Sequence, residues 1–138
     1  MDEGRTALPV RVLLCDDAAD IRMLFRIELE AEGDIAVIAL ASTGEEAIDL
    51  ARNARPDVTL IDLGLPGKSG LETIDDLVAE GIGGAIVVVS GAAGATPQRE
   101  SLDRGAFAFV GKRAPAEELR KAVRQAARAA QGAGGDGR

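Results

Sequence analysis

The sequence predicts a single α/β domain in which helices cover both faces of a five-stranded parallel sheet. Three observations support this fold class. The length of 138 residues suits one domain, apolar runs of β-forming residues alternate with amphipathic helical patterns, and this alternation occurs five times. Because crossovers between parallel strands are right-handed, such an order of elements folds into a doubly wound (βα)5 domain.

The first predicted elements are a buried strand and an amphipathic helix. Residues 10–15 form an apolar run that stops at an acidic pair, which is typical of a strand buried on both faces. Ile21, Phe25 and Leu29 then recur every four residues among charged residues. This spacing places them on one face of a helix, and Gly33 marks the end of that helix.

A second strand, a second helix and a third strand follow in order. The strand covers residues 35–40, and a segment with capping hydroxyls and an acidic first turn, 42–46, opens the helix. The helix runs to about Asn53 and cannot continue through Pro56. The third strand covers residues 58–61 and ends at a carboxylate.

The third helix is predicted over residues 71–79 and the fourth strand over 85–89. All five residues of that strand are small or β-branched, so it has no polar face, as expected of a central parallel strand. In the fourth helix, Thr96 is the predicted cap and Pro97 the first helical residue. This short helix ends near Gly105.

The last predicted elements are a strand over 107–110 and a helix that starts at Pro115, with Leu119, Val123 and Ala126 on one stripe. The chain then becomes Gly-rich, which is typical of flexible segments. These boundaries predict three segments: an N-terminal extension over 1–8, the domain over 9–130 and a Gly-rich tail or linker over 131–138.

Composition and charge exclude several classes of protein. The net charge of −7 argues against direct binding to nucleic acid, which needs a basic surface. No apolar run approaches the roughly 18 residues needed to cross a membrane, and the charged start lacks the apolar core of a signal peptide. The single Cys15 suits a reducing cytosol. Because the chain has no histidine, its chemistry must rest on carboxylates, hydroxyls and Lys.

Polar side chains follow four of the five predicted strands. Asp16 and Asp17 follow the first strand, Asp62 the third, Ser90 the fourth and Lys112 the fifth. Taken singly, each has an ordinary interpretation as a helix cap, a turn former or a solvated charge. Taken together, they should converge, because the carboxyl ends of parallel strands meet at one edge, where ligands bind.

This convergence predicts a site for a divalent metal and a phosphoryl group. Three neighbouring carboxylates repel one another, and a hard cation such as Mg²⁺ relieves that repulsion. An Asp can act as a nucleophile towards phosphorus. Lys112 would then neutralise charge on the transferred group, and Ser90 could donate a hydrogen bond to it.

In this order, the polar residues resemble the receiver domain of two-component response regulators. The resemblance covers about residues 9–130 and includes Pro66, Gly70 and the stretch 105–112. It implies a flavodoxin-like fold with strand order 2-1-3-4-5, with Asp62 as the phosphoacceptor. It also assigns four oxygen ligands to Mg²⁺ or Mn²⁺: Asp16, Asp17, Asp62 and the backbone carbonyl of Gly64.

The resemblance further implies a signalling switch. Lys112 and Ser90 would bind the phosphoryl group, and Ser90 with Phe109 would change the face made by the fourth helix, fifth strand and fifth helix. Phe109 lacks the hydroxyl of a Tyr, so burial favours its inward position. On the first helix, Met23 and Ile27 would face a kinase, or else they are partly buried edges of the core.

The same resemblance implies the partners. A histidine kinase or a histidine phosphotransfer protein would donate the phosphoryl group. The target would be a downstream protein or an effector domain outside this chain, and a phosphorylation-dependent homodimer would fit. We expect a cytoplasmic protein that does not bind membranes and that catalyses only its own phosphorylation and dephosphorylation.

Some residues depart from the family pattern. Arg113 stands where receivers often have a Pro in cis linkage, so we expect no cis bond after Lys112. By resemblance, the residues at Gly64 and Ala92 control the access of water to the acyl phosphate. Both are small, so we hypothesise ordinary or fast loss of the phosphoryl group.

Three other functions are alternatives to that of a receiver domain: a P-loop protein, a dehalogenase-type phosphatase and a pseudo-receiver. The segment 62–69 ends in Gly-Lys-Ser like a phosphate-binding P-loop, but Asp62 replaces its first Gly and Pro66 removes a backbone donor. A dehalogenase-type phosphatase would need Asp-x-Asp after the first strand, and the segment 15–18, Cys-Asp-Asp-Ala, does not supply it. The main alternative is a pseudo-receiver, a protein-interaction module that works without phosphorylation.

Overall fold

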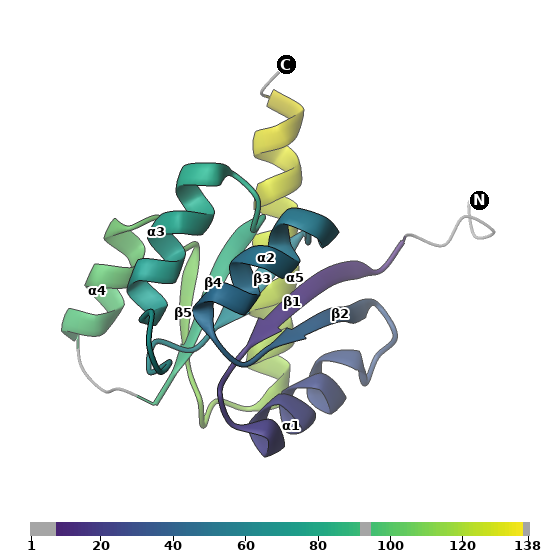
Figure 1. Ribbon diagram of the computed structural model, residues 1–138. Helices are drawn as coiled ribbons and strands as arrows, with labels where there is room; N and C mark the ends of the chain where they lie inside the picture. Colours follow the sequence, from purple (N-terminus) through teal and green to yellow (C-terminus); the bar gives the residue numbers. More distant parts are fainter. Residues whose placement is uncertain (1–7, 92–94, 137–138) are drawn as a thin grey trace, which may run out of the picture.

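A parallel sheet of five strands forms the centre of the molecule (Figure 1). The computed structural model describes residues 8–91 and 95–136, with side chains as far as Gln131. The sheet order is β2-β1-β3-β4-β5 and every pairing is parallel, which confirms the predicted fold class and strand order. The strands are β1 (Val10–Cys15), β2 (Ile35–Ala41), β3 (Val58–Ile61), β4 (Ala85–Ser90) and β5 (Ala108–Gly111).

Helices cover both faces of this sheet. The described helices are α1 (Ala19–Glu30), α2 (Gly44–Ala54), α3 (Gly70–Glu80), α4 (Ala95–Asp103) and α5 (Ala116–Asp136). On one face, α1 and α5 pack their apolar stripes against the strands, as Phe25, Leu29 and Val123 show. On the other face, α2 and α3 contribute Ile48 and Ile74 to a second apolar cluster. Figure 1 shows α4 beside α3.

The interior is almost wholly aliphatic. Its largest fully buried side chains are Leu, Ile and Val, mostly from β1, β3 and β4. Phe25 is the one aromatic residue among the buried hydrophobic side chains that the structure describes. A central strand buried on both faces needs residues that fit a pleated surface on either side, and the β-branched run of β4 meets that need.

Two helix starts are fixed by side-chain caps, of which only that of α2 was predicted from the sequence. Thr43 caps α2 by accepting a hydrogen bond from the backbone of Glu46. Ser69 and Glu72 form a reciprocal capping box at the start of α3. This box ends the loop that follows β3, so the start of α3 is well defined close to the predicted site.

Several helix boundaries differ from the predictions, most of them by one residue. The fourth helix begins at Ala95, so the prediction that Thr96 caps it and that Pro97 is its first residue is wrong. Pro tolerates any position in the first turn of a helix, and its presence therefore fixes a start only approximately. The last helix continues to Asp136, past the predicted domain boundary at residue 130. None of the described helices combines the length and apolarity needed to span a bilayer.

Candidate functional site

Three carboxylates gather at the carboxyl edge of the sheet. Asp16 and Asp62 directly follow β1 and β3, which are paired in register through Cys15 and Ile61. The backbone N–H of Asp62 donates to the carbonyl of Cys15 at 3.1 Å, so the two chain segments stay together beyond the strands. One oxygen each from Asp16, Asp17 and Asp62 lies within 4.8 Å of the others.

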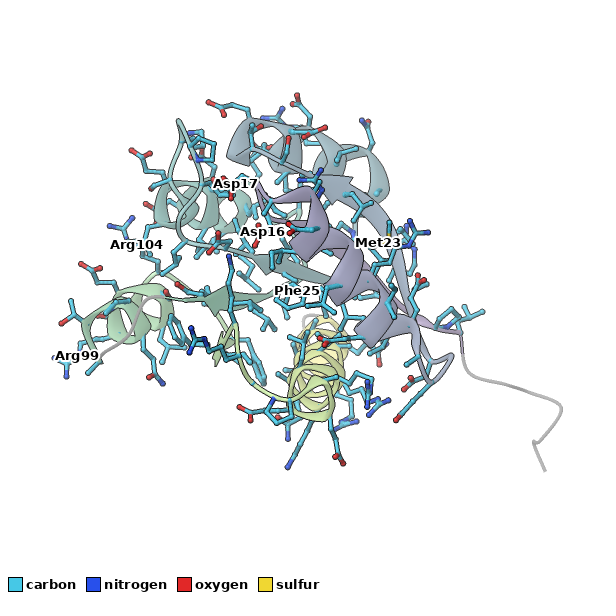
Figure 2. The ribbon with its side chains drawn as sticks, turned by 90° about the horizontal axis from the view of Figure 1, so that it is seen from below. Asp16, Asp17, Met23, Phe25, Arg99 and Arg104 are labelled. Atoms are coloured by element: carbon cyan, nitrogen blue, oxygen red, sulfur yellow. The ribbon has the colours of Figure 1, made fainter. Side chains whose placement is uncertain are left out.

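The three carboxylates differ in their burial. Asp16 and Asp62 are only 1% and 6% exposed, whereas Asp17 is exposed at the start of the turn into α1 (Figure 2). Buried like charges at this separation repel strongly. A divalent cation with oxygen ligands suits such a cluster, because Mg²⁺ prefers a few carboxylates and keeps other positions for water or phosphate oxygens. The residues therefore fit the predicted metal.

Lys112 bridges two of the carboxylates. Its Nζ lies 3.0 Å from Oδ2 of Asp16 and 3.2 Å from Oδ2 of Asp62. Partial burial alone would lower the pKa of Lys112, but the hydrogen bonds and charges of Asp16 and Asp62 outweigh it and raise that pKa above its usual value. Lys112 therefore keeps its positive charge beside the acidic cluster.

Ser90 is held next to Lys112 by strand pairing. Ser90 ends β4 opposite Gly111 of β5, and the backbone N–H of Lys112 donates to the carbonyl of Ser90 at 3.1 Å. The Ser90 side chain is buried. Phe109, on β5, is half-buried and packs against the apolar cluster on the α2 and α3 side of the sheet. Its part in a switch stays a prediction.

The loop after Asp62 is fixed by a glycine. A Cβ at Gly70 would lie 2.6 Å from the carbonyl oxygen of Asp62 and 2.5 Å from Cα of Leu63, so only Gly allows this approach. Gly64 lies exposed in the same loop, and a Cβ there would be 3.7 Å from Oδ2 of Asp62. Coordination of a metal by the Gly64 carbonyl stays a prediction. Ala92, the other small residue singled out, lies outside the described residues.

Cys15 is a buried structural thiol. Its Sγ lies 3.4 Å from the carbonyl oxygen of Thr43. Burial, followed by the charges of Asp16, Glu46 and Asp62, raises the pKa of Cys15 to about 12. The thiolate is therefore disfavoured at neutral pH, and Cys15 is not a nucleophile of this site.

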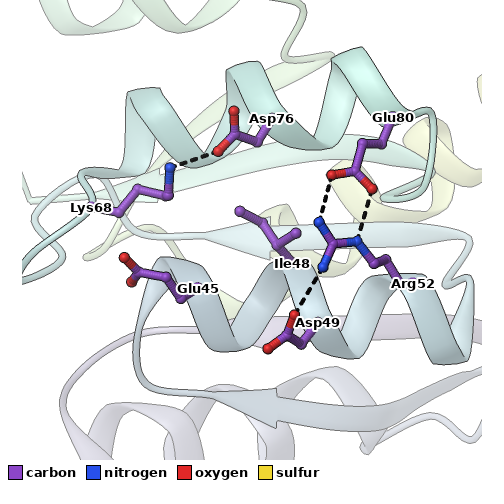
Figure 3. Close-up of a pocket in the computed structure, with 7 residues that line it drawn as sticks. All are labelled: Glu45, Ile48, Asp49, Arg52, Lys68, Asp76 and Glu80. Atoms are coloured by element: carbon purple, nitrogen blue, oxygen red, sulfur yellow. Dashed lines mark hydrogen bonds and ion pairs between the residues drawn. The ribbon is translucent and has the colours of Figure 1, made fainter.

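A separate groove of about 260 Å³ lies between α2 and α3 (Figure 3). Arg52 of α2 pairs with Glu80 of α3 at 2.7 Å and so ties the two helices together across the groove. Lys68, in the loop before α3, pairs with Asp76 of α3 at 2.6 Å. None of the three clustered carboxylates lines it, so the groove is distinct from the acidic site.

The outer face of α1 is apolar at two positions. Met23 and Ile27 are 62% and 61% exposed, while Phe25 points into the interior (Figure 2). The interpretation of Met23 and Ile27 as partly buried edges of the core is therefore wrong. That they face a kinase stays a prediction.

One cation near the site was not singled out from the sequence. Nη1 of Arg22, on α1, donates to the backbone carbonyl of Asp16 at 2.7 Å. The sequence carries little signal for this bond, because Arg22 looks like one of several polar residues on a solvated helix. Only the geometry of the turn before α1 brings its side chain back to Asp16.

Comparisons with known proteins agree with this geometry. Residues 12–124 match the family described as response regulator receiver domain. The nitrate/nitrite response regulator protein NarL of Escherichia coli strain K12 is 39% identical over 119 residues, which cover 86% of this chain and 55% of NarL. A protein-glutamate methylesterase/protein-glutamine glutaminase of Moorella thermoacetica is 38% identical over 119 residues, which cover 85% of this chain and 28% of that protein.

Solved structures show the same fold. The signal receiver domain of a response regulator named NarL from Mycobacterium tuberculosis superposes with a TM-score of 0.84 at 26% identity, covering 88% of this chain and 98% of that one. The chain thus spans nearly the whole of an isolated receiver domain, but only about half or less of the two curated relatives.

Proposed function

Because this chain belongs to the response regulator receiver family, we propose that it is a phosphoacceptor signalling domain whose acceptor is Asp62. A histidine kinase or a histidine phosphotransfer protein supplies the phosphoryl group. The single observation that carries this proposal is the buried cluster of Asp16 and Asp62 bridged by Lys112, with Asp17 beside it. Such a cluster costs stability unless it binds a ligand.

The proposed transfer forms a mixed anhydride on Asp62. A carboxylate oxygen of Asp62 attacks phosphorus while the bond from phosphorus to the donor nitrogen breaks, and the electron pair of that bond stays on nitrogen. Lys112, already 3.2 Å from Oδ2 of Asp62, stabilises the negative charge that builds on the phosphoryl oxygens. The hydroxyl of Ser90 donates to one of those oxygens.

Asp16, Asp17 and Asp62 would hold Mg²⁺ or Mn²⁺, together with the backbone carbonyl of Gly64. When bound, the cation neutralises charge on the carboxylates and on the phosphoryl oxygens. The carboxylates contribute by their placement, since Asp16 and Asp62 are fixed at the ends of paired strands. A hydrolytic water later attacks the acyl phosphate from the open side of Gly64.

The proposed output is a change in the face formed by α4, β5 and α5. The phosphoryl group carries about −1.5 to −2 charges and three strong acceptors, and it replaces the single negative charge of the Asp62 carboxylate. Ser90 moves towards these oxygens, and the space it leaves allows Phe109 to pass from half-buried to buried. The fourth helix, which is short, shifts with it.

The proposed partners follow from the family and from the length of the chain. The target is a downstream protein or an effector domain, since the curated relatives are longer than this chain. A phosphorylation-dependent homodimer is a further form of output. We propose a cytoplasmic place of action and no enzymatic activity beyond the domain's own phosphorylation and dephosphorylation.

Intact mass spectrometry tests this function. The protein is incubated with acetyl phosphate and Mg²⁺, with and without a chelator, beside the Asp62→Asn variant. We expect one added phosphoryl mass in wild type with Mg²⁺, and none with chelator or in the variant. A folded wild type that gains no mass would favour the pseudo-receiver alternative.

A further inference from the structure

Asp17 is the least restrained of the three clustered carboxylates. Asp16 and Asp62 are buried and continue the hydrogen-bond ladder of the sheet through their backbone N–H groups. Asp17 is exposed and lies in the turn between β1 and α1. The placement of its carboxylate therefore depends on how rigid that turn is.

The start of α1 lacks the usual means of fixing such a turn. The N-cap residue of this helix is Ala18, which has an extended backbone and offers no side-chain cap. By contrast, Thr43 caps α2 and Ser69 caps α3. An Ala at this position forfeits a hydrogen bond that typically stabilises a helix start by about 1 kcal/mol.

Two hydrogen bonds to Asp16 hold the turn before α1, although neither satisfies a helix N–H as a cap would. The backbone N–H of Ala18 donates to Oδ1 of Asp16 at 2.9 Å. Nη1 of Arg22 donates to the backbone carbonyl of Asp16 at 2.7 Å. Both bonds span Asp17, because their donors, Ala18 and Arg22, follow it in the chain and their acceptor, Asp16, precedes it. Together they close the turn that carries Asp17.

Arg22 is well placed for this task. It is half-buried, and its backbone N–H donates to the carbonyl of Ala18 at 3.0 Å, so the side chain starts from a fixed point of the helix. A guanidinium presents its donors in a rigid plane and directs them better than an ammonium does. Its charge also lies close enough to Glu46, at the start of α2, to interact with it.

We propose that Arg22 is a positioning residue for the divalent-cation site: by holding the Asp16 carbonyl it orients the Asp17 carboxylate towards the metal. This inference rests on the proposed function, because it takes the three carboxylates to be the metal ligands. Arg22 itself touches neither the metal nor the phosphoryl group. It acts through the turn that carries Asp17.

Simple electrostatics makes the opposite prediction, which renders the proposal testable. A positive charge beside a cation site weakens cation binding, so its removal should tighten binding by Coulomb's law alone. If Arg22 positions Asp17, its removal should instead weaken binding. Loss of a residue that orients a metal ligand typically lowers the affinity for the metal ten- to a hundredfold, and we expect about tenfold here.

The experiment titrates metal-free full-length protein with Mn²⁺ and follows the free ion by electron paramagnetic resonance, without any phosphoryl donor. The variants are Arg22→Met, which removes charge and donors, and Arg22→Lys, which keeps the charge but not the planar donor. Arg26→Met is the matched control, because Arg26 lies one turn further along α1 and pairs with Glu30. Asp17→Asn reports whether the carboxylate is a ligand.

The proposal expects Kd for Mn²⁺ to rise about tenfold in Arg22→Met, less in Arg22→Lys and not at all in Arg26→Met. In amide NMR spectra of the metal-free proteins, the signals of Asp17 and Ala18 should shift in Arg22→Met and not in Arg26→Met. If Arg22→Met does not fold, Arg22→Lys decides, because its unchanged charge leaves geometry as the cause of any weakening.

Unchanged or tighter Mn²⁺ binding in the Arg22 variants would overturn the positioning role. If wild type binds Mn²⁺ and Asp17→Asn weakens it in the same series, the proposed function stands and only this inference fails. If wild type shows no saturable binding, the metal site of the proposed function fails and this inference fails with it.

Discussion

At the scale of single residues, the two buried carboxylates have different surroundings. Asp16 is engaged at both oxygens, since Oδ1 accepts from the backbone of Ala18 and Oδ2 pairs with Lys112. A carboxylate held in this way suits the role of a fixed metal ligand that we propose for Asp16. Asp62 lies at the end of a central strand and has the loop of Gly64 on its open side. This asymmetry favours Asp62 as the acceptor.

Substitution of Gly64 should slow the loss of the phosphoryl group. A Cβ at this exposed position would sit 3.7 Å from Oδ2 of Asp62, which is ordinary contact, so we expect a larger side chain to extend from it and screen the acyl phosphate from water. We expect Gly64→Leu to slow hydrolysis roughly fivefold, which corresponds to about 1 kcal/mol in the barrier. Gly64→Ala should have a smaller effect.

The rate of hydrolysis is measured from the decay of the phosphorylated mass after acetyl phosphate is removed. Equal rates in wild type and Gly64→Leu would contradict the view that Gly64 leaves the attack path open. A wild-type lifetime of many hours would contradict the expectation of ordinary or fast loss.

The convergence of Asp16, Asp17 and Asp62 could be predicted from the sequence because strand ends are easy to recognise. Asp16, Asp62 and Ser90 directly follow apolar runs, and parallel topology brings such ends to one edge. Arg22 could not be found in this way. Its bond to Asp16 depends on the path of a turn and on one side-chain rotamer, and no periodic pattern encodes either.

At the scale of elements, the close contact between α3 and the loop after β3 holds Asp62, the proposed acceptor, in place. The first residue of α3, Gly70, lies against the backbone of Asp62 and Leu63, and its N–H donates to the carbonyl of Leu63 at 3.2 Å. The capping box of Ser69 and Glu72 fixes the helix end that makes this contact.

We predict that Gly70→Ala destabilises the domain by about 1–3 kcal/mol, because the added Cβ meets backbone atoms that cannot move aside cheaply. It should also slow phosphorylation, since the loop that carries Asp62 must shift. Gly111→Ala is the matched control, as a Cβ there meets nothing within 4 Å. Urea denaturation gives the stability, and equal values for the two variants would contradict the prediction.

A second contact between elements is an ion-pair cluster that joins α5 to the loop between α1 and β2. Nε of Arg124 lies 2.6 Å from Oδ2 of Asp34, and its Nη2 lies 2.7 Å from Oε1 of Glu32. The hydrogen bond from Arg124 holds the pKa of Asp34 below its usual value. A carboxyl whose pKa is lower in the folded state than in the unfolded state stabilises the fold at pH values above its pKa in the unfolded state. This stabilisation is lost as the pH falls through its pKa in the folded state.

We therefore predict that Asp34→Asn lowers the free energy of unfolding by about 0.5 kcal/mol at pH 7, the range of exposed ion pairs. The difference from wild type should shrink below about pH 4, where the unfolded carboxyl and then the folded one take up protons. Urea denaturation across this pH range measures it. A difference that stays constant down to pH 3 would show that the ion pair is not its cause.

The order and type of the helices and strands were predicted correctly, but the start of α4 and the end of α5 were not. Strands were recognised because buried parallel strands are continuous apolar runs, as in β4. The start of α4 at Ala95 and the end of α5 at Asp136 differ from the predictions. Helix ends depend on hydrogen bonds of single residues, and Gly lowers helix propensity without forbidding a helix.

At the scale of the whole molecule, α5 extends beyond the sheet that it covers (Figure 1). The last buried side chain among those described on this helix is Ala127. The described side chains that follow it, as far as Gln131, are not buried. That the domain is energetically complete by residue 130 stays a prediction. Whether residues 131–138 contribute to the stability of the domain can be tested directly.

We predict that removal of residues 131–138 changes the free energy of unfolding by less than about 0.5 kcal/mol, the usual effect of changes away from the core. Phosphorylation of Asp62 should also be unaffected. Urea denaturation and intact mass measure the two properties. A loss of more than about 1 kcal/mol would place the domain boundary further along α5.

The identity of the phosphorylated residue tests the central claim most directly. Borohydride converts an aspartyl phosphate into homoserine, and peptide mass spectrometry then locates the altered residue. After incubation with acetyl phosphate and Mg²⁺, we predict homoserine at position 62 and unmodified Asp16 and Asp17. Homoserine at either of those two positions, or a phosphorylated protein with none at position 62, would contradict the account.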